Sequence, residues 1–96
     1  MSYENKLKNM SNEALHLECV TFVDAVTGDD NNRKLSNPEE KDQANKIMIA
    51  SIKRMDNDSN SIELLRSCTV TLQNIIKDSS EKYSDIPKQI LKWKPK

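Results

Sequence analysis

The chain of 96 residues contains a single glycine, Gly28, and this scarcity of glycine constrains the fold more than any other feature of the sequence. Glycine supplies backbone conformations with positive φ that other residues resist, so tight turns and phosphate-binding loops usually draw on it. A chain with a single glycine is therefore expected to consist of helices joined by polar loops. It also cannot contain a glycine-rich nucleotide-binding loop, because those motifs need more than one glycine.

The clearest helix signal lies in the segment Asn37-Pro38-Glu39-Glu40. Asn37 is a good helix cap, Pro38 suits the first helical position, and Glu40 stands where the carboxylate of a capping box reaches back. We expect this helix at about 38–55. Its apolar stripe, at helical spacing, consists of Ala44, Ile47, Met48, Ile52 and Met55.

A second helix is expected at about 11–27, capped by Ser11 or Asn12. Gly28 follows its last turn, where a residue in a left-handed conformation commonly ends a helix. The segment 3–9 before it fits either a short helical turn or a loose stretch. The apolar stripe of the predicted helix consists of Leu15, Cys19, Phe22, Val23 and Val26.

Two more helices follow in the second half of the chain. One is expected at about 61–77, with Asn60 as its cap and Glu63 as the partner in a capping box. A shorter one, at about 85–93, takes Pro87 in its first turn and is stopped by Pro95.

These elements predict an all-α fold, a single domain spanning 1–96. It is an antiparallel bundle of three main helices plus a short C-terminal fourth helix, because short loops favour antiparallel neighbours. The longest connection, 28–37, is expected to be its most mobile part. A domain of this size buries only roughly 60–70% of its unfolded surface, so a homodimer would enlarge a small core.

One polar segment, 56–60, has the Asp-x-Asp-x-Asn spacing that opens an EF-hand calcium loop. Ser61 and Ser67 occupy the places where that loop needs a glycine and a bidentate glutamate. The alternative is a polar break between helices that carries capping residues. Because the ligand set is incomplete, we predict the break and no calcium.

His16, Cys19 and Cys68 form a second incomplete set of metal ligands. A structural zinc site needs four ligands, and the sequence offers no further Cys or His pair. A Cys–His nucleophile would need an exposed, electropositive setting, which nothing in the sequence supplies. Both cysteines lie on apolar stripes, where cysteine acts as a small hydrophobic residue. We predict no metal and no cofactor, and whether Cys19 touches Cys68 stays open.

No motif of an enzyme is present in the sequence. The adjacent carboxylates Asp29–Asp30 and Glu39–Glu40 are typical of solvated loops and helix starts, with no apolar pocket to raise a pKa. There is no nucleophile elbow, P-loop or dinucleotide fingerprint. We therefore predict no catalytic residues and no enzymatic activity.

Four apolar residues lie away from the main stripes: Leu17, Val20, Ile49 and Val70. Single exposed apolar residues are common, but several that converge on one patch indicate a protein–protein interface. The alternative is that the fourth helix covers some of them. We predict that these residues bind another protein.

The C-terminal tail offers a different function, because it interleaves lysines with apolar residues. Its candidate nucleic-acid contacts are Lys88, Lys92, Trp93, Lys94 and Lys96. Lysines can follow phosphates while a tryptophan stacks on a base, and the same pattern can lie on an anionic membrane surface. In the alternative, Ile90, Leu91 and Trp93 dock on the bundle and the lysines are solvated. The formal net charge of the chain is zero and gives no overall attraction to nucleic acid.

The predicted function is that of a small non-enzymatic regulator, inhibitor or adaptor, and the alternative is a nucleic-acid-binding protein. No stretch approaches the ~20 apolar residues of a membrane span, and the start of the chain lacks the pattern of a secretory leader. We expect a complete gene product located in the cytoplasm with reduced thiols. The bias toward lysine and asparagine fits an AT-rich genome, as in many bacterial or viral accessory proteins.

Overall fold

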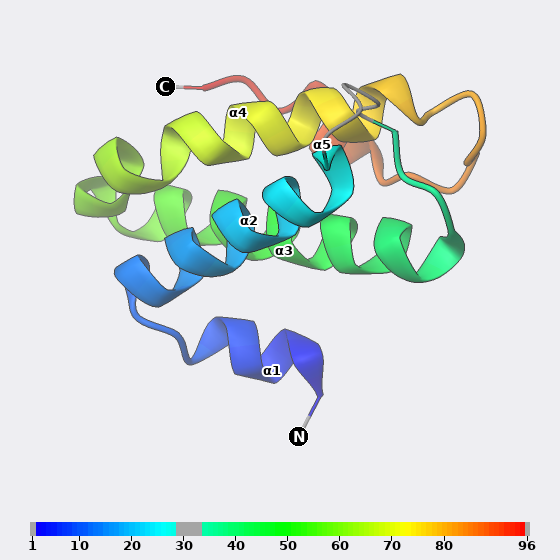
Figure 1. The fold of residues 1–96 in the computed structure, drawn as a ribbon. Coiled ribbons are helices and arrows are strands. Elements are labelled where there is room, and N and C mark those ends of the chain that lie inside the picture. Colours follow the sequence, from blue (N-terminus) through cyan, green and yellow to red (C-terminus); the bar gives the residue numbers. More distant parts are fainter. Residues whose placement is uncertain (1, 29–33, 96) are drawn as a thin grey trace.

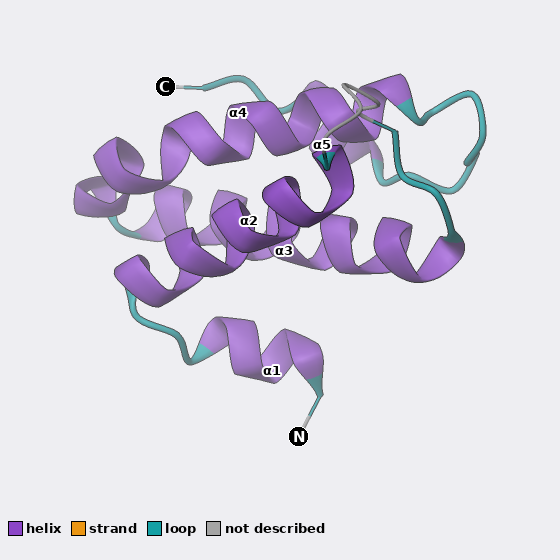
Figure 2. Ribbon diagram, in the orientation of Figure 1, coloured by secondary structure: helices purple, strands orange, loops and turns teal. Residues whose placement is uncertain are grey.

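Helices account for most of the described chain. The structure, a computed structural model, describes residues 2–28 and 34–95, and these residues form no strand. The helices are α1 (Tyr3–Lys8), α2 (Asn12–Thr27), α3 (Pro38–Asn57), α4 (Ile62–Asp78) and α5 (Lys88–Lys92), with a 3-10 turn η1 (Ser59–Ser61) (Figure 1, Figure 2). The predicted all-helical class is confirmed. The radius of gyration of 12.5 Å matches that of a compact chain of this length.

The caps predicted for α2 and α3 are present. Ser11 Oγ accepts a 3.1 Å hydrogen bond from the backbone N–H of Ala14, and Asn37 Oδ1 accepts one of 2.9 Å from that of Glu40. The Glu40 carboxylate reaches back one residue further than a capping box requires and binds the backbone N–H of Ser36 at 2.7 Å. Ser11 and Asn37 each satisfy a backbone N–H in the first turn of a helix, where no partner within the helix is available.

The turn between α3 and α4 is capped by Asp58, so the prediction of Asn60 as the cap is wrong. Asp58 Oδ1 accepts the backbone N–H of Asn60 at 3.0 Å, which draws Asn60 into η1. Ser61 then donates its hydroxyl to the Arg54 carbonyl at 3.1 Å, and α4 begins at Ile62. The Asp58 side chain accepts the backbone N–H of Asn60, so Asn60 belongs to the 3-10 turn and does not cap α4.

The last helix begins at Lys88, later than the predicted start at 85. Ile86 precedes Pro87, and the proline ring disfavours helical backbone for the residue before it. Asp85 instead pairs with the Lys41 side chain of α3. Pro87 is thus the residue before α5 rather than a member of its first turn.

The segment 3–9, which the sequence left open, contains α1. Ser2 Oγ caps it by accepting the Asn5 N–H at 3.2 Å, and Leu7 is fully buried. Figure 1 shows α1 beside the two longer helices α2 and α3. Leu7 is the one fully buried residue of this six-residue helix, and Tyr3 packs partly against the core.

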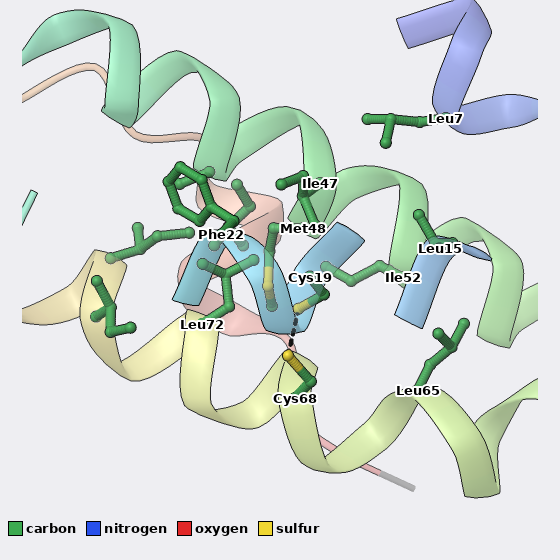
Figure 3. Close-up of a cluster of buried hydrophobic side chains, with 14 of the residues drawn as sticks. Leu7, Leu15, Cys19, Phe22, Ile47, Met48, Ile52, Leu65, Cys68 and Leu72 are labelled. Carbon is green, nitrogen blue, oxygen red and sulfur yellow. Dashed lines mark hydrogen bonds between the residues drawn. The ribbon is translucent and has the colours of Figure 1, made fainter. Parts of the chain in front are cut away.

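The core lies between α2, α3 and α4, and Figure 3 shows part of it. Leu35, Ile86 and Ile90 add to it from outside the three main helices, and each is at most 8% exposed. Leu35 comes from the connection 28–37, of which 29–33 lie outside the described residues. The expectation that this connection is mobile therefore falls largely outside the described residues.

Gly28 ends α2, as the sequence predicts. Its φ of +48° is in the region that favours glycine, and its N–H donates to the Asp24 carbonyl at 3.1 Å. Its ψ of −149° is more extended than that of the usual left-handed cap. The one glycine of the chain therefore occupies a position with positive φ.

Candidate functional site: the groove between α1 and α3

A groove of about 610 Å³ lies between α1 and α3. Its apolar lining comes from Leu7 on α1 and from Ile49 and Ala50 on α3. A volume of this size falls within the range of ligand-binding clefts, roughly 300–1,000 Å³.

Arg54 of α3 fixes the end of α1 that leads into α2. Its guanidinium donates to the carbonyl of Met10 at 2.8 Å, to the carbonyl of Lys8 at 3.4 Å and to Asn12 Oδ1 at 2.8 Å. A planar guanidinium can serve several acceptors at once, which a lysine cannot do in the same way. The turn between α1 and α2 is therefore tied to the C-terminal part of α3.

Tyr3 fixes the opposite end of α1. Its hydroxyl donates to Glu18 Oε1 of α2 at 2.7 Å and accepts from Gln43 Nε2 of α3 at 3.4 Å. The pKa of Tyr3 is raised to about 12, mainly because the phenol is partly buried and also because it donates a hydrogen bond to the Glu18 carboxylate. The phenol consequently remains protonated and able to donate throughout the neutral range.

The charged side chains around the groove are mainly basic. Lys8, Lys46, Lys53 and Arg54 line it, against the two carboxylates of Glu4 and Asp42. Lys46 Nζ lies 3.9 Å from Glu4 Oε1, an ion pair between α3 and α1. Lys8 and Lys53 are exposed at the groove. The net excess of positive charge favours an occupant that carries carboxylates.

The four predicted interface residues lie in different settings. Leu17 is 64% exposed, the only large apolar side chain among the described residues to be so open. Val20, Ile49 and Val70 are half-buried, and Val20 and Ile49 pack against the core. The groove includes Ile49 and none of the other three.

The C-terminal tail is attached to α4 by Gln73. The Gln73 amide, 4% exposed, donates to the carbonyls of both Ile90 and Trp93 at 2.8 Å each. Ile90 is fully buried, and Leu91 and Trp93 pack partly against the core. This is the docked arrangement that the sequence offered as the alternative to a nucleic-acid-binding tail.

The lysines of the tail remain on the surface. Lys88, Lys92 and Lys94 are exposed, and Lys96 lies outside the described residues. Trp93 is half-buried, so part of its indole is already covered.

The structure brings Cys19 and Cys68 into contact, with 2.7 Å between the two Sγ atoms (Figure 3). Both thiols are buried and free. His16 lies half-buried nearby in sequence, and the described part of the chain holds no cluster of three or more His, Cys, Asp or Glu side chains suited to a metal. In the calcium-like segment, the Asp58 carboxylate is occupied by Asn60 and by Asn12, 3.4 Å away.

Sequence reasoning missed a cationic cluster around Tyr83. Lys41 is 8% exposed, pairs with Asp85, and lies 5.7 Å from the centre of the Tyr83 ring. Lys82 Nζ lies 5.5 Å from the same ring. Pairing with Asp85 raises the pKa of Lys41 and lowers that of Asp85. The one available signal was the spacing of Lys41, three residues before Ala44 on the apolar stripe.

Comparisons with protein-family models, with curated proteins and with solved structures find no match to this chain. Among the described residues, no helix combines the length and the apolar character needed to cross a membrane.

Proposed function

We propose that this protein is a non-enzymatic regulator, inhibitor or adaptor that binds a segment of a partner protein in the groove between α1 and α3. The observation that carries the proposal is the combination of the half-buried apolar side chains of Ile49 and Ala50 with a basic surround. Helical and extended segments of proteins commonly bind such grooves through apolar side chains, while charges set register and specificity.

The charges of the groove define the chemistry of the partner. Lys8 and Lys53 are exposed, so a carboxylate can approach them without breaking an existing contact. An apolar side chain flanked by Asp or Glu would contact Ile49 and these lysines together. The predicted partner segment is therefore acidic and amphipathic.

The proposal includes the predicted arrangement of the domain, an antiparallel bundle. The short connection from Asp58 to Ser61 and the close packing of α3 with α4 support this topology. We also place the protein in the cytoplasm, where the free thiols of Cys19 and Cys68 would be kept reduced.

The decisive experiment captures the partner from the native host and then measures direct binding with the purified pair. Lys8→Glu combined with Lys53→Glu reverses two exposed charges at the groove and should weaken binding at least 10-fold if about 1.4 kcal/mol is lost. Lys77→Glu, on the exposed face of α4, is the matched control and should bind normally. Circular dichroism confirms that each variant is folded. Equal binding by all variants would exclude the groove.

The alternative function is nucleic-acid binding by the tail, supported by the exposure of Lys88, Lys92 and Lys94. Binding to DNA and RNA at two salt concentrations tests it, because phosphate contacts weaken steeply as salt rises. Salt-sensitive binding that disappears on truncation before Lys88 would replace the protein-interaction proposal. A dimer in light scattering that dissociates on Leu17→Asp would instead identify a second copy of the chain as the partner.

A further inference from the structure

Cys19 of α2 and Cys68 of α4 form a close pair of free thiols outside the groove. Their Sγ atoms are 2.7 Å apart, although 49 residues separate them in sequence. Figure 3 shows the two side chains pointing toward one another between the helices. A disulfide requires Cβ atoms roughly 3.5–4.5 Å apart and side chains that face each other, and the second condition is met here.

Burial by itself does not account for this placement. Cysteine is often buried as a small apolar residue, and such a role needs no sulfur partner. Here each thiol has the other as its direct neighbour, on two helices that pack closely along their length. The pair is therefore arranged for a reaction that a single buried cysteine cannot undergo.

We propose that Cys19 and Cys68 form a reversible disulfide that joins α2 to α4 when the protein meets a low-molecular-weight disulfide such as oxidised glutathione. In the first exchange the Cys68 thiolate attacks one sulfur of the oxidant, which breaks the oxidant's S–S bond and releases one thiolate. In the second, the Cys19 thiolate attacks the Cys68 sulfur and releases the other. The protein loses two protons and two electrons, and the oxidant gains them as two thiols.

The two cysteines differ in a way that sets this order. Cys68 is 9% exposed and Cys19 is 1% exposed, so the oxidant reaches Cys68 first. Burial raises the pKa of the Cys19 thiol. The more accessible Cys68 is therefore the attacking residue and Cys19 the resolving one.

The consequence is a redox-dependent change in how firmly α2 is held. Leu17 and Val20 are on the same helix as Cys19, so the disulfide would restrain the part of the surface that they occupy. The disulfide would close a loop between residues 49 positions apart and so reduce the conformational entropy of the unfolded chain. The thermal midpoint of the oxidised protein should therefore be higher by roughly 10 °C or more. Addition of dithiothreitol should reverse the shift.

The test treats the native, purified protein with oxidised glutathione and follows the free thiols and the intact mass. The expected product has lost two hydrogen atoms, contains no bound glutathione, and yields one peptide pair linking Cys19 to Cys68 after non-reducing digestion. Cys19→Ala should stop at the mixed disulfide on Cys68. Cys68→Ala should react far more slowly, because its remaining thiol, that of Cys19, is the more deeply buried of the two.

A denatured control separates native placement from chance encounter. In urea the thiols are far apart on average, so intramolecular closure should be at least 10-fold slower than in the native protein. Accumulation of a stable mixed disulfide, of linked dimers, or of a disulfide that forms only in urea would each overturn the proposal. Because the wild-type protein carries the main result, an unstable variant does not affect the conclusion.

Discussion

The backbone N–H of Leu35 donates a 2.9 Å hydrogen bond to the hydroxyl of Ser79, which lies 44 residues further along the chain. Both residues are at most 2% exposed. Ser79 in turn donates its hydroxyl to the Ile75 carbonyl at 2.9 Å. One serine therefore closes the C-terminal end of α4 and fixes the connection that leads into α3.

Ser79→Ala should destabilise the protein by about 1–3 kcal/mol, because it leaves the buried N–H of Leu35 without a partner. Urea unfolding followed by circular dichroism measures the change. Ser80→Ala is the control, since Ser80 is exposed and its hydroxyl bonds only the nearby Lys77 carbonyl. Equal losses in the two variants would show that the contact with Leu35 adds nothing.

Asp85→Asn should lower the thermal midpoint at neutral pH and have little effect in strong acid. The ion pair with Lys41 lowers the pKa of Asp85 in the folded state, so the unfolded chain binds more protons as the pH falls. The stabilisation is complete above the unfolded pKa of about 3.9 and is lost as the pH drops through the lower, folded value. Thermal melts between neutral pH and strong acid provide the comparison.

Glu81→Gln serves as the control for this pH dependence, because Glu81 is exposed in the same connection between α4 and α5. Its melting profile should follow that of the wild type. If the thermal midpoints of Asp85→Asn and the wild type differed by the same amount down to the lowest pH, the stabilisation would not come from the ion pair with Lys41.

Gly28→Ala should cost about 1 kcal/mol, because a side chain disfavours the positive φ of this residue. A Cβ at this position would meet no heavy atom within 4 Å, so the loss comes from the backbone conformation. Gly28→Ser should therefore lose nearly the same amount in urea unfolding. A variant as stable as the wild type would mean that the end of α2 adopts another conformation without loss.

Gln73→Ala should release the C-terminal tail, because it removes the donor to both Ile90 and Trp93. Trp93 is the single tryptophan of the chain and reports the change directly. Its fluorescence should shift to longer wavelength, and acrylamide should quench it more strongly. Gln89→Ala, an exposed glutamine on α5, should leave the emission unchanged.

The helices that could be predicted from the sequence are those whose capping residues and apolar stripe lie close together in the chain. The predicted helix at 38–55 appears as α3, Pro38–Asn57, because its cap, its proline and its apolar stripe all lie within one stretch. The helix that ends at Gly28 was predicted for the same reason. The predicted start of α5 is too early, because Pro87 disfavours helical backbone at Ile86 and this restriction outweighs the apolar spacing.

The candidate site could not be predicted because it depends on contacts between distant residues. Leu7 is one apolar residue in a polar segment, and its burial follows from where Tyr3 and Arg54 hold α1. Ile49 was recognised as lying off the main stripe, but its neighbours across the groove come from a helix that the sequence left open. Periodicity identifies a face of one helix and does not say which element lies opposite.

The short connection between α3 and α4, closed by Asp58, has a consequence for the order of folding. The entropy lost on loop closure grows with loop length, so these two helices can associate before any of the long-range contacts form. Substitutions at Ile47 or Leu72 in their core should accordingly slow refolding. Loss of the Leu35–Ser79 contact, which joins residues far apart in sequence, should mainly accelerate unfolding.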